Sequence, residues 1–392
     1  MKSYDVVIAG AGPGGCGAAI AAARAGLRVL LVEKRQEIGS PKRCGEGLSR
    51  SSLERMGIEY NPVWMRRKII GATVYAPNGK FVRYDGEDLG WIIERKVFDK
   101  WLANKAVSAG AKVLAKTEVV DIIREEGILS GVVLYSQGKE VRIKTKILIA
   151  ADGVESKVAR LVGFRTNLNP SDLVSGFQYE MAGVDIDPDR IELYFGNEIA
   201  PGGYVWIFPK GETIANIGIG VRKPFAKKTA KEYLDEFIES KPGLRNGSIL
   251  EVNAGGVPVG GLMENMVSDG FMIVGDAAHQ VNPIHGGGIS EAFVGGKIAG
   301  EVAAEAIKAG DVSAEFLKVY NERWWEERGK KLQKIFKLRL VAESLTDDEL
   351  NWLAEYLSGE DLVNLSKSKG FVKFAKLLMK KPRLITLARK LL

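Results

Sequence analysis

The first residues whose types and spacing could do chemistry are glycines near the start of the chain. The segment Gly10-Ala11-Gly12-Pro13-Gly14-Gly15 follows a short apolar run, Tyr4 to Ala9, and precedes an alanine-rich segment that ends at Gly26. Glycines at this spacing permit a tight turn and let a pyrophosphate approach the backbone where a helix begins. Glu33 follows a second apolar run, where its carboxylate could accept hydrogen bonds from a ribose. This segment predicts a dinucleotide site.

Three aromatic residues in the middle of the chain alternate with apolar ones. Tyr204, Trp206 and Phe208 are each two residues apart, so in a strand they share one face. Such a face could form a rigid apolar wall that binds a hydrophobic ligand. The pattern alone fits ordinary packing in a half-buried strand somewhat better. Gly218 and Gly220, on the next predicted strand, leave room for a ligand or for close contact within the sheet.

Two acidic residues end two further buried strands. The first strand ends in Asp152-Gly153, and the second ends in Gly275-Asp276. Together with the glycine-rich segment, they resemble the FAD-dependent family that includes the aromatic-ring hydroxylases. The resemblance implies FAD as the cofactor, with the ribityl chain bound by Asp276.

Two signatures give a closer resemblance. Pro41-Lys42-Arg43-Cys44-Gly45-Glu46-Gly47-Leu48 and Tyr204-Val205-Trp206-Ile207-Phe208-Pro209, with Gly218-Ile219-Gly220 behind the latter, resemble the geranylgeranyl reductase family. The best match is the archaeal branch that saturates the isoprenoid chains of digeranylgeranylglycerophospholipids, and the chlorophyll-pathway branch shares much of the pattern. The resemblance implies an FAD-dependent oxidoreductase acting on CH–CH groups in membrane lipid biosynthesis, with an isoprenoid glycerophospholipid as substrate.

The same resemblance assigns expected roles to single residues. It implies that the aromatic wall, with its glycines, binds the lipid, through Tyr204, Trp206, Phe208, Gly218 and Gly220. The resemblance also implies the residues that bind the cofactor. The adenosine half of FAD would be held by Gly10, Gly12, Gly14, Gly15 and Glu33, with a backbone contact from Val119 to the adenine. The flavin and ribityl chain would be contacted by Cys44, Gly45, Gly47, Arg95, Asp276, Gly288 and Ile289.

Reduction of an isolated double bond needs a hydride and a proton. We hypothesise that protonation gives the more substituted carbon cationic character, which aromatic faces stabilise, while hydride arrives from the flavin. A helix predicted over 290–306 would place its positive N-terminus at the flavin. Candidate proton donors are Cys44, Tyr204, His285 and water, and we nominate Cys44 and Tyr204 as catalytic. A packing role for Cys44 is an equal alternative.

Composition excludes several classes of protein. The chain has 392 residues, a net charge of +7 and ordinary globular composition. Two cysteines and two histidines predict neither a disulfide framework nor a metal site. No apolar run is long enough to span a membrane and no signal peptide is expected, so we predict a cytoplasmic protein, with peripheral contact at the cytoplasmic membrane face as an option.

The positive charge is concentrated in one segment. Residues 367–392 hold nine lysines and arginines and no acidic residue, while the rest of the chain is near neutral. This distribution argues against a nucleic-acid partner. The segment predicts a basic amphipathic helix whose apolar side holds Phe371, Phe374 and Leu378. Such a helix could lie on an anionic membrane or pack on the body with its lysines in solvent.

These residues require an α/β fold that brings distant segments together. We expect a Rossmann-like FAD-binding domain (residues 1–68, 90–165 and 255–310) and an inserted antiparallel-sheet catalytic domain that binds lipid (69–89 and 166–254). A helical C-terminal region, 311–392, completes the chain. Helices are predicted over 95–109 and 230–240, and strands over 69–75, 173–181, 191–195, 204–208 and 214–220.

Other functions fit part of the pattern. The FAD motifs also suit a geranylgeranyl reductase of another isoprenoid pathway, an FAD-dependent aromatic monooxygenase, or a membrane-surface electron carrier. The aromatic wall and the Cys44 segment favour the lipid reductase. No second dinucleotide motif is present, and two cysteines cannot hold an iron–sulfur cluster. Electrons would therefore come from an external ferredoxin, NAD(P)H or a deazaflavin.

Overall fold

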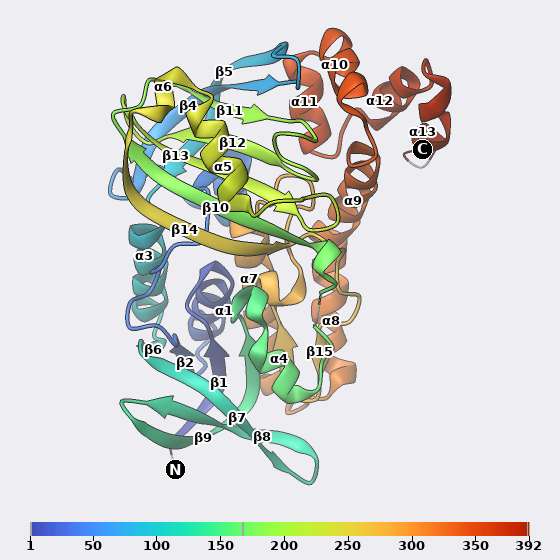
Figure 1. Ribbon diagram of the computed structural model, residues 1–392. Helices are drawn as coiled ribbons and strands as arrows, with labels where there is room; N and C mark the ends of the chain where they lie inside the picture. Colours follow the sequence, from blue (N-terminus) through green and yellow to red (C-terminus); the bar gives the residue numbers. More distant parts are fainter. Residues whose placement is uncertain (1, 167, 390, 392) are drawn as a thin grey trace.

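The computed structural model describes residues 2–166, 168–389 and 391. Two eight-stranded sheets lie at opposite ends of the molecule, and helices from the last part of the chain run beside both (Figure 1). The predicted α/β fold with a helical C-terminal region is confirmed. The numerical division into three regions stays a prediction.

The first sheet has a parallel core that begins at the N-terminus. Its strand order is β15-β16-β9-β1-β2-β6, and β7 and β8 extend it as an antiparallel hairpin on β9. Val6, Val7 and Ile8 in β1 are fully buried because helices cover the parallel core. The strands are β1 (Lys2–Ala9), β2 (Val29–Val32), β6 (Lys112–Leu114), β7 (Thr117–Glu125), β8 (Ile128–Ser136), β9 (Lys139–Ala150), β15 (Val267–Ser268) and β16 (Phe271–Ile273).

Two helices on this sheet pack backbone to backbone through glycines. They are α1 (Pro13–Arg24) and α7 (Ile289–Ala309). A Cβ atom at Gly296 would lie 1.9 Å from the carbonyl oxygen of Gly14, and one at Gly300 would lie 2.4 Å from that of Ala18. Only glycine permits this approach. The packing holds the N-termini of both helices at the same end of the sheet.

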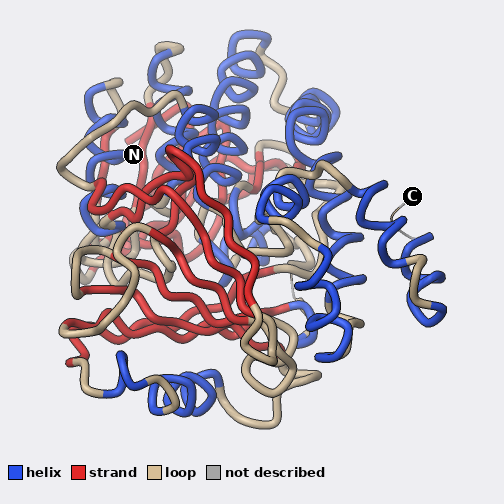
Figure 2. Tube along the Cα trace, turned by 90° about the horizontal axis from the view of Figure 1, so that it is seen from above, coloured by secondary structure: helices blue, strands red, loops and turns tan. Residues whose placement is uncertain are grey.

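The second sheet is antiparallel except for one pair of strands. Its order is β14-β10-β13-β12-β11-β4-β5-β3, and only β11 and β4 pair in parallel. Figure 2 shows its strands side by side, with helices at its outer face and at one end. The strands are β3 (Gly47–Ser49), β4 (Met65–Tyr75), β5 (Phe81–Ile93), β10 (Leu173–Ala182), β11 (Arg190–Tyr194), β12 (Tyr204–Pro209), β13 (Ile214–Arg222) and β14 (Ser248–Pro258).

The two faces of the second sheet differ. Val205, Ile207, Ile217 and Ile219 point outward into a buried cluster that includes residues of α5 (Ala230–Glu239). The opposite face carries the predicted aromatic wall, because side chains alternate along a strand. Four other helices precede α7 in the chain: α2 (Arg50–Met56), α3 (Arg95–Ser108), α4 (Lys157–Val162) and α6 (Pro242–Arg245).

The predicted helices are present, and the predicted strands are present with shifted ends. Strand β4 begins at Met65 rather than at residue 69, and β5 and β14 were not predicted as strands. The sequence predicts residues 69–89 in the antiparallel sheet but no strand over 81–93, which include the polar run Asp85-Gly86-Glu87-Asp88. In the ladder, Gly71 pairs with Asp85 and Ile69 with Gly90, so residues 86–89 bulge from an otherwise regular strand.

The C-terminal region is a chain of helices with a small core of its own. Buried Leu338, Leu353, Phe374 and Leu378 form part of this core. Phe374 and Leu378, on the apolar side of the predicted amphipathic helix, therefore pack against the other C-terminal helices, while Lys376 points to solvent. Lys390 and Leu392, at the end of the predicted basic segment, lie outside the described residues. The elements are α8 (Ala314–Trp324), a π-helical turn η4 (Trp325–Gly329), α9 (Lys330–Ala342), α10 (Asp347–Tyr356), α11 (Gly359–Ser366), α12 (Phe371–Leu378) and α13 (Ile385–Arg389).

Candidate functional site

One large cavity joins the two sheets and the C-terminal helices. Its volume is about 1330 Å³, above the roughly 300–1,000 Å³ of ordinary ligand sites, and its surface is mostly apolar. Two of the predicted site residues, Gly15 and Gly218, do not line it. Those that do are Gly10, Gly12, Gly14, Glu33, Cys44, Gly45, Gly47, Arg95, Val119, Tyr204, Trp206, Phe208, Gly220, Asp276, Gly288 and Ile289.

At one end, the cavity has the shape and the polar groups that a dinucleotide needs. Gly12 caps α1 without a side chain, and a Cβ atom there would meet nothing within 4 Å. The carboxylate of Glu33 accepts hydrogen bonds from the backbone nitrogens of Ala11 and Arg35, both at 3.0 Å. Open space beside a helix N-terminus, with a carboxylate next to it, fits the pyrophosphate and ribose of FAD.

Gly15 contributes by packing. A Cβ atom at Gly15 would lie 1.8 Å from the carbonyl oxygen of Gly10, so this glycine lets α1 approach the end of β1. This is the role expected of the third glycine in such a turn.

A second helix N-terminus faces the middle of the cavity. Helix α7 starts at Ile289, and its N-cap Gly288 offers no side-chain hydrogen bond. The carboxylate of Asp276 lies beside Gly288 and receives no hydrogen bond from any described residue; one of its oxygens is 3.1 Å from a Cβ built at Gly288. Burial raises the pKa of Asp276 to about 6, against the opposing effect of Arg95. An unpaired, half-buried carboxylate is suited to accept a hydroxyl of the ribityl chain.

The Cys44 segment is tightly folded against the aromatic wall. The Cys44 sulfur accepts a hydrogen bond from the backbone nitrogen of Glu46 at 3.2 Å. Cβ atoms at Gly45 and Gly47 would lie 3.0 and 3.2 Å from the Phe208 ring. Both glycines let the segment pass close under that ring. Glu46 itself has a φ angle of 71°, an uncommon backbone conformation for a residue other than glycine.

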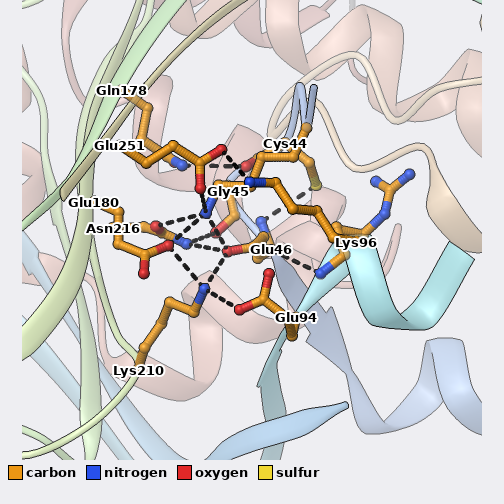
Figure 3. A network of polar contacts seen from close by, with 12 residues as sticks. Cys44, Gly45, Glu46, Glu94, Lys96, Gln178, Glu180, Lys210, Asn216 and Glu251 are labelled. Carbon is orange, nitrogen blue, oxygen red and sulfur yellow. Dashed lines mark hydrogen bonds and ion pairs between the residues drawn. The ribbon is translucent and has the colours of Figure 1, made fainter. Parts of the chain in front are cut away.

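A buried network of charged side chains holds Glu46 in place (Figure 3). Its carboxylate accepts hydrogen bonds from the side chains of Lys42 and Lys210, both at 2.9 Å, and from Asn216 at 2.7 Å. It also accepts one from the backbone nitrogen of Arg95 at 2.7 Å. Burial disfavours the ionised form of Glu46, but Lys210 and Lys42 outweigh this effect and lower its pKa.

The network extends into the second sheet. Glu180 accepts hydrogen bonds from Lys42 at 2.6 Å and from Lys210 at 2.9 Å, and Glu94 accepts one from Lys210 at 2.8 Å. These carboxylates keep both buried lysines charged: the pKa of each lies above its usual value despite burial. The network therefore fastens the Cys44 segment to β10 and β13. Sequence reasoning missed it, and the only signal was the Lys42–Glu46 spacing around Cys44.

The aromatic wall is linked to the Cys44 segment through Gln178. The Trp206 indole nitrogen donates to Gln178 at 2.8 Å, and the Gln178 amide donates to the carbonyl oxygen of Cys44 at 3.2 Å. Tyr204, at the other end of the wall, donates its hydroxyl to the carbonyl oxygen of His285 at 2.7 Å. The wall thus contacts both loops that carry predicted flavin contacts.

The candidate proton donors differ in their surroundings. Burial raises the pKa of Tyr204, so its hydroxyl keeps its proton at neutral pH. Burial lowers the pKa of His285, which favours the neutral ring; its Nδ1 accepts a hydrogen bond from the Gly287 backbone nitrogen at 3.1 Å. Arg95 is paired with Asp99 at 2.8 Å, and both Asp99 and Cys44 raise its pKa although burial opposes its charge.

The described residues include no cluster of three or more histidine, cysteine, aspartate or glutamate side chains suited to a metal ion. Among them, no helix combines the length and apolar character needed to cross a bilayer.

The chain matches two family models. Residues 172–257 match the geranylgeranyl reductase catalytic domain, and residues 5–174 match the FAD dependent oxidoreductase model. The first match contains the aromatic wall and Gln178, and the second contains the glycine-rich turn, Glu33 and the Cys44 segment.

Similar proteins cover the whole chain. A digeranylgeranylglycerophospholipid reductase of Methanocaldococcus jannaschii is 46% identical over 99% of this chain and 98% of its own length. The crystal structure of a geranylgeranyl bacteriochlorophyll reductase-like protein from Thermoplasma acidophilum has a TM-score of 0.92, 36% identity and full coverage of both chains. A triple mutant of the flavin-dependent brominase Bmp2 has a TM-score of 0.74 at 20% identity, with 98% of both chains covered, and shares the fold. The chain belongs to the geranylgeranyl reductase family of FAD-dependent oxidoreductases.

Proposed function

We propose that this protein uses FAD to saturate the double bonds of geranylgeranyl chains on digeranylgeranylglycerophospholipids, a step of archaeal membrane lipid biosynthesis. The observation that carries the proposal is the continuity of the cavity, which runs from the nucleotide end past Trp206 and Phe208 to the apolar C-terminal helices. A prenyl chain lying in this space would have its double bonds beside the Cys44 segment. Family membership and the near full-length relatives support the same activity.

The chain's own residues have three tasks in this reaction. Bound FAD supplies the hydride. Tyr204, Trp206 and Phe208 bind the prenyl chain, exclude water and face the carbon that becomes cationic. The free backbone N–H groups at the start of α7 stabilise negative charge nearby. Cys44 or Tyr204 would give a proton to one alkene carbon, the other carbon would receive the hydride that bound FAD supplies, and a proton from water would restore the donor.

The cofactor contacts inferred from the sequence are part of the proposal. Arg95 and Asp276 would border the flavin and its ribityl chain, and Val119 would contact the adenine. Support comes from their common position on the cavity wall. Flavin absorbance of single variants after dialysis tests each contact.

Two finer points also belong to the proposal. The first is an external electron donor, a ferredoxin, NAD(P)H or a deazaflavin, which anaerobic flavin bleaching with each donor would identify. The second is peripheral contact between the lysines of the basic segment and an anionic membrane. Because Phe374 and Leu378 are buried, such contact would depend on charge. Sedimentation with anionic vesicles at low and high salt tests it, since salt should release the protein.

A direct assay separates the lipid reductase from its rivals. We expect purified protein with chemically reduced FAD to saturate digeranylgeranylglycerol phosphate, measured by mass spectrometry as a gain of two hydrogens per double bond. An aromatic monooxygenase would instead consume oxygen with phenols. A pure electron carrier would leave the lipid unchanged unless a partner enzyme is added. A reductase of another isoprenoid pathway would prefer a prenyl substrate without glycerol phosphate.

A further inference from the structure

Basic side chains gather where the cavity meets the C-terminal helices. Arg55, on α2, and Arg328, in the π-helical turn η4, line the cavity there. Lys331, at the start of α9, lines it as well, together with Lys367 and Lys369 in the turn between α11 and α12. We call these five residues the basic rim. Residues of the same cavity at α10 and α11 are apolar: Leu350, Leu353, Leu357, Leu362 and Leu365.

The two arginines of the basic rim share a single carboxylate. Arg328 donates to both oxygens of Glu291, at 2.7 and 2.6 Å, and Arg55 donates to Glu291 at 3.2 Å and to Ser290 at 2.8 Å. Glu291 is 4% exposed, so these charges are poorly screened by water. Two guanidinium groups against one carboxylate leave an excess positive charge at the cavity wall. Arg328 also sits in a π-helical turn, a feature common at functional sites.

The three lysines of the basic rim lack acidic partners. Their side chains are exposed, and no described residue forms an ion pair with them. Two other lysines, in α9 and α12, are paired: Lys330 with Glu326, and Lys373 with Asp361. The Ser368 hydroxyl donates to the carbonyl oxygen of Lys331 at 3.3 Å, which brings the two lysine-bearing segments together. Lys331, Lys367 and Lys369 thus bring to the cavity wall three positive charges that no carboxylate of the described residues neutralises.

We propose that the basic rim binds the phosphate group of the lipid substrate, while its prenyl chains extend inward along the apolar wall. This inference rests on the proposed function, because it takes the substrate to be a phospholipid. Among the described residues, Glu291 is the one carboxylate that forms an ion pair with any of these five cations, so the rim keeps a positive charge that suits a phosphate bearing one or two negative charges. Anchoring the phosphate there would determine which end of the lipid enters the cavity first.

A binding experiment that needs no turnover tests the basic rim. Full-length FAD-loaded protein is titrated, in a neutral detergent, with saturated diphytanylglycerol phosphate and with neutral diphytanylglycerol, by calorimetry. For Lys331→Gln/Lys367→Gln/Lys369→Gln we expect about tenfold weaker binding of the phosphate lipid and unchanged binding of the neutral lipid. The matched control is Lys334→Gln/Lys337→Gln, which removes exposed charges from the same helix α9 outside the cavity. It should bind both lipids as the unsubstituted protein does.

Additional measurements distinguish a lipid headgroup from a free phosphate ester, and failure of this proposal from failure of the proposed function. Glycerol phosphate alone should compete only weakly if the site recognises a lipid headgroup, whereas strong competition would indicate a site for free phosphate esters and overturn the proposal. Equal loss of both lipids, or no loss, would also overturn it. If the triple variant binds lipid normally and slows only reduction by an acidic electron-transfer protein, while dithionite-driven reduction is unchanged, the rim is a donor-docking surface. A protein that binds the phosphate lipid but reduces no alkene would instead refute the proposed function and leave the binding site standing.

Discussion

The side chain of Trp206 occupies the space above Gly218 on the adjacent strand. The two residues pair directly across β12 and β13, and a Cβ atom at residue 218 would lie 2.3 Å from Cζ2 of the indole. The sequence left two roles open for Gly218: room for a ligand, or close contact within the sheet. The structure fills that room with the aromatic wall itself. Glycine at position 218 therefore makes room for the Trp206 ring. The Trp206 indole nitrogen donates to Gln178, whose amide in turn donates to the carbonyl oxygen of Cys44.

We expect Gly218→Ala to impair lipid reduction more than FAD binding. The added methyl group collides with the indole ring, so Trp206 must move and lose its hydrogen bond to Gln178. Lipid reduction should fall about tenfold, because about 1.4 kcal/mol of binding or positioning is lost. Steady-state rates and flavin absorbance report the two effects. Gly211→Ala is the control, since its Cβ would meet no atom closer than 3.9 Å. A normal rate for Gly218→Ala would contradict the role assigned to Trp206.

Two glycines of the nucleotide turn should respond differently to alanine. Gly12 has open space beside it and an ordinary φ angle of −77°, so Gly12→Ala should leave the stability of the apoprotein unchanged. Its methyl group would occupy the space assigned to the pyrophosphate, and FAD affinity should fall by about tenfold or more. Gly15→Ala should destabilise the fold itself by about 1–3 kcal/mol, because its Cβ overlaps the Gly10 carbonyl.

Fluorescence titration with FAD and thermal unfolding of the apoproteins separate these two outcomes. Retention of full FAD affinity by Gly12→Ala would mean that the pyrophosphate lies elsewhere.

The stability of the Glu46 network should depend on pH. Burial opposes the ionised form, but Lys210 and Lys42 prevail and the pKa of Glu46 is lowered. A lowered folded-state pKa stabilises the fold above the unfolded value of about 4.3, and this contribution is lost as pH falls through the folded value. Glu46→Gln should therefore cost about 2–4 kcal/mol at pH 7, because it leaves buried lysines short of a carboxylate.

Urea denaturation at pH 7 and below pH 4 measures the difference in unfolding free energy between Glu46→Gln and the unsubstituted protein. This difference should be smaller at the acidic pH. Glu54→Gln is the control, because Glu54 pairs with Arg50 on the surface and should change little at either pH. A penalty for Glu46→Gln that does not depend on pH would mean that packing, rather than charge, holds the Cys44 segment.

Replacing each cysteine by alanine in turn tests whether Cys44 donates the proton or has only a packing role. If the Cys44 thiol gives up the proton, Cys44→Ala should slow lipid reduction about a hundredfold or more and leave FAD bound. Cys16→Ala is the matched control, since Cys16 is fully buried within α1 and donates to the carbonyl oxygen of Ala11. Single-turnover reduction from the chemically reduced protein provides the rate. A rate for Cys44→Ala equal to that of the unsubstituted protein would leave Tyr204, His285 and water as proton donors.

The nucleotide half of the site could be predicted because its signals are local. Gly10, Gly12 and Glu33 lie within one strand–helix–strand unit, and the spacing of these residues already specifies where a phosphate and a ribose lie. Alternation at 204–208 likewise placed three aromatic side chains on one face, because strand geometry fixes that relationship.

The charged network could not be predicted, because its members come from distant segments. Nothing in the sequence marks Lys42 or Lys210 as buried, because lysine side chains are usually exposed to solvent. Both lysines reach the Glu46 carboxylate because β12 pairs with β13 and the Cys44 segment lies against that sheet. The basic segment was ambiguous for the same reason: its apolar side needed a partner, and the partner is the core of the C-terminal helices.

The cavity is one undivided space, and this has a consequence for the order of events. Every double bond of a long prenyl chain would have to be brought in turn to a single reactive position, so the lipid must slide along its own length between rounds. A partly saturated chain would then be both a product and the next substrate. Such a protein should release a ladder of intermediates when lipid is in excess and the fully saturated compound when lipid is scarce.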